Sequence, residues 1–282
     1  DRNEAALNRL WILTLDETDR WREALERVPG GDEPYFQPGF YDAAVRHQPD
    51  TQAECAVFEE QGELVVYPYL RRRLRALPFV PQDSDACDIT GAYGYNGAVT
   101  TTQDHALWGR FRTAFADHCK QTHALTEFVR FHPLLGNAAV FASDCAIEVQ
   151  NQNVALDLRR PLEEIRARYA HSCRKNIKRA EREHVQTIVE EGIGPTFEAF
   201  LRIYQDTMTR VSAEAAYDFG GAYVETLAER LVPKPLFVYA TYRGRVVSCE
   251  MALRSRRIIY SYLGGTEAAA YPVSPNNALK DA

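Results

Sequence analysis

The pattern of apolar and polar positions divides the first half of the chain into strands and helices. Apolar and polar side chains alternate in residues 53–60 and 63–74, on either side of Gln61-Gly62, which predicts a β-hairpin. Apolar residues at helical spacing predict three helices, at residues 16–28, 35–47 and 104–122. Shorter apolar runs predict strands at residues 10–15, 87–99 and 126–134, with one or two more in 146–158.

The second half repeats this order of elements. A basic helix is expected first, followed by a strand at 187–192, helices at 195–211 and 220–232, and strands at 235–243, 245–255 and 257–266. We therefore expect an α/β protein of two tandem modules, each with a mixed, mostly antiparallel central sheet flanked by helices. The expected modules are residues 1–155 and 156–282.

The basic segment 159–184 is expected to form one long helix, with Pro161 in its first turn. Apolar or aromatic residues recur at every fourth position and would face a core: Ile165, Tyr169, Cys173 and Ile177. Basic residues at i, i+1, i+4 and i+5 form one stripe: Arg174, Lys175, Lys178 and Arg179. Such a stripe suits a phosphate-rich partner, although a solvated helix face would have the same pattern.

Composition narrows the class of protein. Hydrophobic residues make up 45% of the chain and charged residues 26%, as in an ordinary globular protein. The net charge of -6 argues against a general nucleic-acid coat, so a polyanion site would have to be local. No run of about 18 apolar residues could span a membrane, and the segment DRNEAALNRL does not resemble a signal peptide.

The spacing of the cysteines predicts the cellular compartment of the protein. The six cysteines are scattered and form no CxxC pair, which favours reduced thiols in a cytoplasmic protein over disulfides or zinc ligands. We expect no metal site and no tightly bound cofactor. A substrate at a membrane surface is compatible with the sequence, and no oligomeric state is predicted.

Several motifs follow one another in a fixed order. In the second half they are SCRKNIKRAERE (172–183), IYQDTMTRVSAEAAYDFGGAYVETL (203–227), LFVYATYRGRVVSCEMAL (236–253) and IIYSYLGGTEAAAYPVSPNNALK (258–280). The first half contains ITGAYGYNGAV at 89–99. In order and spacing these motifs resemble the Fem-type (FemAB-like) branch of the GNAT acyltransferases, in which two GNAT-like modules lie in one chain. The resemblance covers roughly residues 40–280.

This resemblance implies transfer of an acyl group from an activated ester to an amine. Characterised Fem-type enzymes take an amino acid from aminoacyl-tRNA and add it to the peptide of a peptidoglycan precursor. Relatives are assigned to polysaccharide or natural-product pathways.

The chain departs from the family in two places. An acetyl-CoA-binding GNAT protein has an R/Q-x-x-G-x-G/A loop after its fourth strand, and neither half of this chain has that spacing. The family also continues past the Ser-Pro-Asn helix start into a glycine-rich strand and a Phe-Lys segment, whereas this sequence stops at Ala282. The second module is therefore expected to be cut short or to be completed in another way.

Candidate residues in the first half lie near the ends of predicted strands. Tyr93 and Tyr95 follow a glycine-broken strand, so their hydroxyls are catalytic candidates, although both rings could instead plug the space between modules. Arg130 and His132 are expected on one strand face, where they could clamp a carboxylate or phosphate of the substrate; a salt bridge capping the core is the alternative.

Candidates in the second half follow the family motifs. Arg210 matches the family's arginine for the acceptor's anionic group, although a helix C-terminus favours a cation in any case. Tyr217 lies in the following loop. Tyr260 and Tyr262 are expected on one strand face, with Ser261 facing away, and Tyr262 is a third catalytic candidate. Asn276 lies at a helix start, with Ser274 as cap and Pro275 at the first position, which is mainly a structural pattern.

Three functions remain open on this basis. The first is an N-acyltransferase that uses aminoacyl-tRNA, with its phosphates on the basic stripe and the amine acceptor in a cleft between modules. The second is an acyl-CoA-dependent N-acyltransferase of polysaccharide or natural-product biosynthesis, against which the missing pyrophosphate loop counts. The third is a non-catalytic module that binds RNA or another anionic partner, with salt-sensitive binding and no turnover.

Overall fold

A computed structural model describes residues 9–214 and 217–282. The chain folds as two compact units, unit 1 (Asp1–Gln150) and unit 2 (Asn151–Ala282), each with its own sheet.

Unit 1 is built on a mixed sheet in which β4 and β6 are parallel and the other pairs are antiparallel. The described strands run in the order β1-β2-β3-β4-β6, with β5 also paired to β3. Their bounds are β1 Leu10–Thr14, β2 Thr51–Glu60, β3 Glu63–Arg73, β4 Cys87–Thr90, β5 Val99–Thr100 and β6 Ala124–Glu127. The predicted hairpin is β2 and β3, and Gln61 and Gly62 both have the positive φ that a tight hairpin turn requires.

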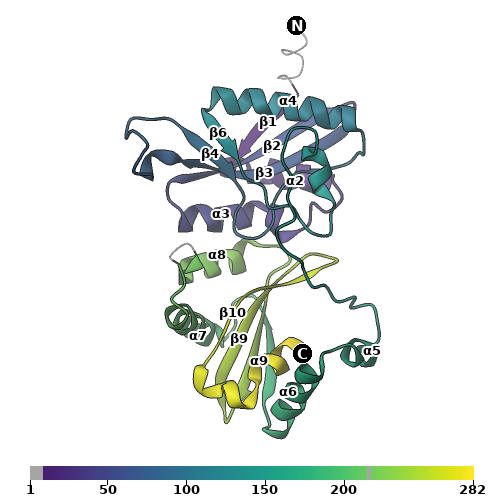
Figure 1. The fold of residues 1–282 in the computed structure, drawn as a ribbon, viewed down its shortest axis with the longest axis vertical. Helices are drawn as coiled ribbons and strands as arrows, with labels where there is room; N and C mark the ends of the chain where they lie inside the picture. Colours follow the sequence, from purple (N-terminus) through teal and green to yellow (C-terminus); the bar gives the residue numbers. More distant parts are fainter. Residues whose placement is uncertain (1–8, 215–216) are drawn as a thin grey trace. The chain divides into compact units, whose positions relative to one another are not determined.

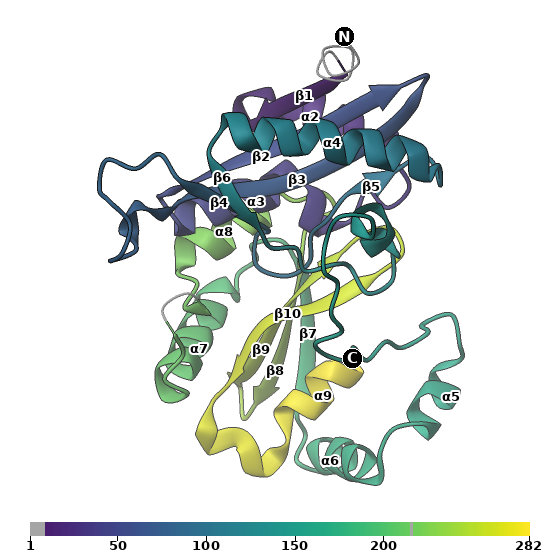
Figure 2. The ribbon, with the colours of Figure 1, turned by 45° about the horizontal axis from the view of Figure 1, so that its top comes forward.

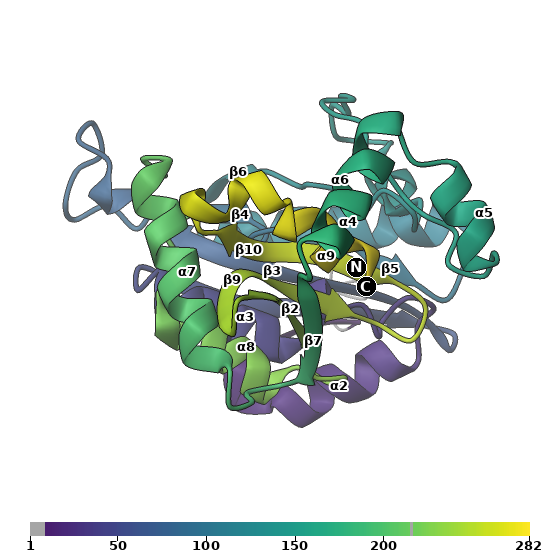
Figure 3. The same cartoon turned by 90° about the horizontal axis from the view of Figure 1, so that it is seen from below.

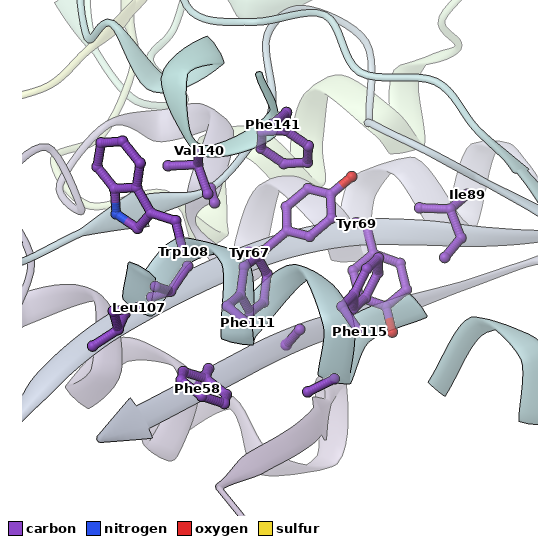
Figure 4. Packing of buried hydrophobic residues seen from close by; sticks show 14 residues of the cluster. Phe58, Tyr67, Tyr69, Ile89, Leu107, Trp108, Phe111, Phe115, Val140 and Phe141 are labelled. Atoms are coloured by element: carbon purple, nitrogen blue, oxygen red, sulfur yellow. The ribbon is translucent and has the colours of Figure 1, made fainter. Parts of the chain in front are cut away.

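Helices cover both faces of this sheet (Figure 1). Helix α4 (His105–Gln121) lies across one face of β2 and β3 (Figure 2), and α2 (Thr18–Glu26) and α3 (Pro38–His47) pack on the other. Figure 4 shows the α4 side of the core, where the ring of Phe115 meets those of Tyr67 and Tyr69 with centroids 5.3 Å apart. These rings, with Phe111 and Leu107 of α4, are buried, which confirms the apolar face predicted for this helix.

Three predicted strands of the first half are shorter or missing. In the 87–99 segment only β4 and β5 are regular. Strand β6 ends at Glu127, and the chain beyond it is held by the side chain of Asn96, whose Oδ1 accepts the Arg130 amide at 2.7 Å. The expected strand at 126–134 is therefore wrong beyond Glu127, because the glycine-broken segment opposite it offers only an isolated bridge.

The strands expected in 146–158 are also wrong. Within the described chain this segment joins neither sheet, and Val149 and Val154 are more than nine-tenths exposed. Alternation of apolar and polar residues predicts a strand only where a partner strand exists.

Unit 2 has an antiparallel sheet in the order β10-β9-β8-β7. Its strands are β7 Gln186–Glu191, β8 Leu236–Tyr242, β9 Arg245–Arg254 and β10 Ile259–Thr266. Its helices are α5 Leu162–Ala167, α6 His171–Arg182, α7 Phe197–Arg210, α8 Gly221–Arg230 and α9 Pro275–Asp281. Helix α7 packs on β9 and β10, whereas α9 contacts β7, β8 and β9 and has α6 beside it (Figure 3).

The basic segment is two helices rather than one. Helix α5 ends at Ala167 and α6 begins at His171, so the prediction of a single helix over 159–184 is wrong. The guanidinium of Arg174 donates to the carbonyls of Ala167 and Tyr169, at 2.8 and 2.6 Å. A cation that bonds the last carbonyl of α5 and a carbonyl of the following turn stabilises the break, which no glycine or proline in the sequence signals.

Candidate active site

A pocket of about 540 Å³ lies along β10, at the edge of the unit 2 sheet. Its walls come from α6, α7, β9, β10, α9 and the 3-10 turn Ala268–Val273. Three residues predicted from the sequence line it, namely Arg210, Tyr262 and Asn276. Tyr217 and Tyr260 are not among its lining residues, and their roles stay predictions.

The pocket wall is shaped by a β-bulge in β10. The pairing of β10 with β9 shifts between Ser261 and Leu263, so the strict alternation of side chains is lost at Tyr262. As a result Ser261 and Tyr262 both line the pocket. Ser261 thus contributes to the pocket wall although the sequence analysis placed only the two tyrosines on the side of the site.

Glycine allows α7 to approach β10 closely. A Cβ atom on Gly265 would lie 2.5 Å from Thr207 Oγ1 and 2.8 Å from the Ile203 carbonyl oxygen. Because any larger residue would push α7 away, Gly265 sets the distance between the strand and the helix that carries Arg210.

Arg210 ends α7 and is held at the pocket rim. Its Nη2 donates to the Thr266 carbonyl at 3.1 Å, and its guanidinium lies 5.4 Å from the ring centroid of Tyr271. These contacts leave several of the five guanidinium N–H groups to donate to an anionic group of a substrate.

The hydroxyl of Tyr262 is engaged within unit 2. It lies 2.5 Å from the hydroxyl of Tyr223, which comes from α8. This hydrogen bond fixes the Tyr262 ring in the pocket wall and couples β10 to α8.

The residues around Asn276 are arranged differently from the predicted cap. Ser274 occupies the N-cap position of α9 with a φ of 55°, and its side chain makes no capping hydrogen bond. Pro275 is at the first helical position as predicted. Asn277 donates to the sulfur of Cys173, at 3.8 Å, which ties α9 to α6.

An ion pair that the sequence analysis missed also lines the pocket. Lys280 on α9 pairs with Glu250 on β9, and its Nζ lies 2.5 Å from Ser261 Oγ. Two signals were available in the sequence. Glu250 is a carboxylate inside an apolar strand, and Lys280 is four residues after Asn276, so both lie on one helix face.

A pocket thiol is unsuited to covalent catalysis. Cys249 lines the pocket, and its burial raises its pKa to about 12. Because the thiolate is the nucleophilic form, this cysteine is inert near neutral pH. Cys249 therefore offers no nucleophile for a covalent enzyme intermediate.

The basic stripe lies on a helix that reaches the pocket. Asn176 of α6 is a lining residue, and Lys175 precedes it directly in the chain. Lys175 and Lys178 are exposed, and neither they nor Arg179 forms an ion pair with a described residue.

The unit 1 candidates gather around one loop. The ring of Tyr95 lies 5.3 Å from that of His132, and Asn137 holds the His132 amide at 3.0 Å. Tyr93 in the same loop is exposed. The roles of Tyr93 and Tyr95 remain predictions.

Arg130 and His132 do not share a strand face, because β6 ends before them. Arg130 is exposed and His132 is buried. Burial lowers the pKa of His132 to about 4, and its Nδ1 accepts the Leu134 amide at 3.1 Å. The imidazole is therefore neutral near pH 7 and adds no positive charge to a clamp.

Two other kinds of site have no candidate in the described part of the chain. Among the residues that the structure covers, no group of three or more His, Cys, Asp or Glu side chains is placed to hold a metal ion. None of the described helices combines the length and apolar character needed to cross a bilayer.

Comparisons with known proteins show similarity in one sequence family and in the fold. Residues 167–282 match the family model described as acetyltransferase (GNAT) domain. The crystal structure of FemX is similar, with a TM-score of 0.64 at 10% identity, over 96% of this chain and 84% of that one. A tandem GNAT protein from the clavulanic acid biosynthesis pathway has a TM-score of 0.47 at 11% identity, over 96% and 83% of the two chains. No curated protein matches the chain.

These findings confirm the predicted fold class and the GNAT resemblance. The family match covers α6 to α9 and thus the elements that build the pocket. FemX shares the fold across nearly the whole chain. Residues 167–282 match a GNAT acetyltransferase domain, which supports an acyltransferase activity, and the chain has a Fem-like GNAT fold.

Proposed function

We propose that this acyltransferase takes an aminoacyl group from aminoacyl-tRNA and transfers it to an amine, such as that of a cell-wall precursor peptide. The observation that carries the proposal is that α6 reaches a polar pocket and also carries three cations of the stripe that form no ion pair with a described residue. Lys175, Lys178 and Arg179 are free to contact phosphates, and Asn176 between them reaches the pocket.

The segment after β10 favours tRNA over a CoA donor. Residues 264–277 contain no R/Q-x-x-G-x-G/A spacing, so the backbone cradle for a pyrophosphate is missing from the place where GNAT proteins have it. A tRNA acceptor end could instead place its phosphates on the stripe, with its ester in the pocket. A cytoplasmic location, which stays a prediction, would give access to charged tRNA.

The pocket residues then have distinct roles in this proposal. Arg210 binds an anionic group of the acceptor, and Asn276 and Tyr262 orient the reacting ester. Aminolysis needs the amine to approach the ester carbonyl in its neutral form, so positioning and proton removal are the main contributions of the protein.

The test is transfer from two donors to one defined acceptor. Purified protein is given either a pool of charged tRNA or acetyl-CoA, together with a synthetic peptide that has one free lysine ε-amine. We expect amino-acid transfer from tRNA that Arg210→Gln lowers by about 10²-fold, whereas Arg243→Gln, in the turn between β8 and β9, leaves it unchanged. Acetyl transfer without amino-acid transfer would contradict the proposal.

The second candidate is an acyl-CoA-dependent N-acyltransferase. The match to the GNAT acetyltransferase domain favours it, because that fold family commonly uses acyl-CoA. Acetyl transfer that is lost in Lys175→Glu would place the CoA pyrophosphate on α6. Tight tRNA binding with no transfer from either donor would instead indicate a non-catalytic RNA-binding module.

A further inference from the structure

Glu250 and Ser261 hold a primary ammonium group in the unit 2 pocket. The ammonium is that of Lys280, which pairs with Glu250 Oε2 and lies 2.5 Å from Ser261 Oγ. Glu250 is fixed in the sheet, with Val238 of β8 and Gly264 of β10 on either side. Lys280 reaches this point from the last turn of α9 through its flexible four-carbon side chain.

The two members of the ion pair differ in exposure. The Glu250 side chain is 10% exposed and that of Lys280 is 44% exposed. Glu250 lies in an apolar run between Cys249 and Met251, where a carboxylate is costly without a cation. Within the described residues it makes no other side-chain hydrogen bond, although a carboxylate can accept about four.

From this geometry we propose that Glu250 and Ser261 form a subsite for the primary ammonium of a substrate, which Lys280 occupies when the pocket is empty. The incoming ammonium displaces the Lys280 side chain, which then returns to solvent from the surface-exposed end of α9. The subsite binds by charge and by hydrogen bonds from N–H groups, so an acetylated amine does not fit it.

The inference rests on the proposed function for its ligand. An aminoacyl donor carries an α-ammonium next to the ester, and the acceptor carries the amine that attacks it. Either group supplies the same chemistry, whereas the acetyl group of acetyl-CoA supplies none. A carboxylate in this pocket therefore favours a substrate with an ammonium group.

The first experiment tests the subsite without any acyl transfer. L-alaninamide and N-acetyl-L-alaninamide are titrated into the full chain and followed by NMR. We expect only the free amine to bind, about tenfold more tightly in Lys280→Met, because the competing side chain is gone. Binding should be lost in Glu250→Gln and weakened about threefold in Ser261→Ala.

Controls separate this result from damage to the fold. Lys234→Met removes an ammonium group and Glu191→Gln a carboxylate, both outside the pocket. Proteins with these substitutions should bind the amine as the wild type does. Thermal melting shows whether each variant is folded, and the milder Ser261→Ala keeps the test valid if Glu250→Gln unfolds. Equal binding of both amides, or weaker binding in Lys280→Met, would overturn the subsite.

The second experiment identifies the source of the ammonium. A pool of charged tRNA is compared with the same pool after N-acetylation. A preference of about tenfold for the free pool that is lost in Glu250→Gln assigns the subsite to the donor. Equal binding of both pools, with alaninamide still bound, assigns it to the acceptor.

The two proposals can fail separately. Alaninamide binding as expected, with no transfer from tRNA or acetyl-CoA, would contradict the proposed function and leave the subsite intact. Transfer from tRNA by a protein that binds no alaninamide would contradict the subsite alone.

Discussion

Residues 71–75 and residues 174–179 each contain four basic side chains, and the structure uses them in different ways. In unit 1, Arg71 pairs with Glu54, Arg72 with Asp88 and Arg75 with Asp50. In unit 2, Arg174 bonds backbone carbonyls, and the other three cations of the stripe form no ion pair with a described residue.

This comparison shows that basic residues in a sequence do not by themselves predict a polyanion site. Carboxylates on β2, on β4 and in the turn before β2 neutralise three of the four arginines, namely Arg71 and Arg72 on β3 and Arg75 in the 3-10 turn that follows. Arg73, at the exposed end of β3, forms no ion pair with a described residue. Helix α6 contains one carboxylate, Glu181, and Glu183 caps its end, so both lie beyond the stripe. Only the unpaired cluster keeps its charge available for a ligand.

The largest expected effect follows from removing Glu54, the β2 carboxylate that pairs with Arg71 in the cluster of Arg71, Arg72 and Arg75, which we call the β3 cluster. Glu54 accepts hydrogen bonds from Tyr69 Oη at 2.7 Å and Arg71 Nε at 2.9 Å. Glu54→Ala should lower the free energy of unfolding by about 3 to 5 kcal/mol, because Arg71 is left partly buried without its partner. Urea unfolding measures this, and a loss below about 1 kcal/mol would contradict a structural role for the cluster.

A similar loss should appear when the wild-type protein is acidified. Burial alone would raise the pKa of Glu54, but hydrogen bonds from His118, Arg71 and Tyr69 lower it to about 2. Since the pKa in the unfolded chain is near 4.5, the stabilisation is complete above that pH and is lost as the pH falls towards 2. The loss is about 3 kcal/mol.

Urea unfolding at a series of pH values checks this prediction. Glu54→Gln is the comparison variant, because it lacks the carboxylate whose protonation causes the loss of stability. The acid response of His132 must be separated from that of Glu54. Because the pKa of His132 is lowered in the folded protein, its contribution reduces stability as the pH falls from about 6.5 to about 4. His132→Gln removes that earlier loss. The same acid sensitivity in Glu54→Gln and in the wild type would show that Glu54 is not the group responsible.

The unpaired cluster should respond in binding rather than in stability. Lys175→Gln combined with Lys178→Gln should weaken binding of charged tRNA by at least about tenfold and lower the salt slope by about 2. Both side chains are exposed, so the free energy of unfolding should change by less than about 1 kcal/mol.

The matched control is the cluster at residues 71–75, with Arg72 on β3 and Arg75 in the 3-10 turn that follows. Arg72→Gln combined with Arg75→Gln removes the same number of cations from the paired cluster and should leave tRNA affinity within about twofold of the wild type. Equal losses in the two double variants would show that binding follows net charge rather than the α6 stripe.

The smallest expected effect concerns an exposed pair of the β3 cluster. Asp50 and Arg75 have side chains that are 53% and 44% exposed, at a separation of 3.0 Å. Asp50→Asn should change the free energy of unfolding by less than about 1 kcal/mol, because solvent screens the pair. A loss comparable with that of Glu54→Ala would mean that the cluster acts as one network.

The sequence predicted those elements of the fold that depend on local patterns. The hairpin of β2 and β3 and the buried face of α4 follow directly from side-chain periodicity. The prediction of strands in 146–158 failed because a strand forms only where a partner strand, distant in the sequence, lies beside it. The break between α5 and α6 was not predicted because Arg174, rather than a helix-breaking residue, stabilises it.

The candidate site was only partly accessible from the sequence. Family motifs selected Arg210 and Asn276, which lie on one pocket, although their roles stay predictions. Glu250 and Lys280 were missed because their contact is created by the packing of α9 on the sheet. The position of Ser261 depends on a bulge that alternation cannot indicate.

The most direct test of the account is a salt series of equilibrium binding to charged tRNA and, separately, to acetyl-CoA. Between about 50 and about 200 mM salt, we expect tRNA affinity to fall steeply for the wild type, less steeply for the α6 double variant, and acetyl-CoA not to bind. Micromolar acetyl-CoA binding that is lost in Lys175→Glu, with tRNA binding that is weak at every salt concentration, would contradict the aminoacyl-tRNA donor.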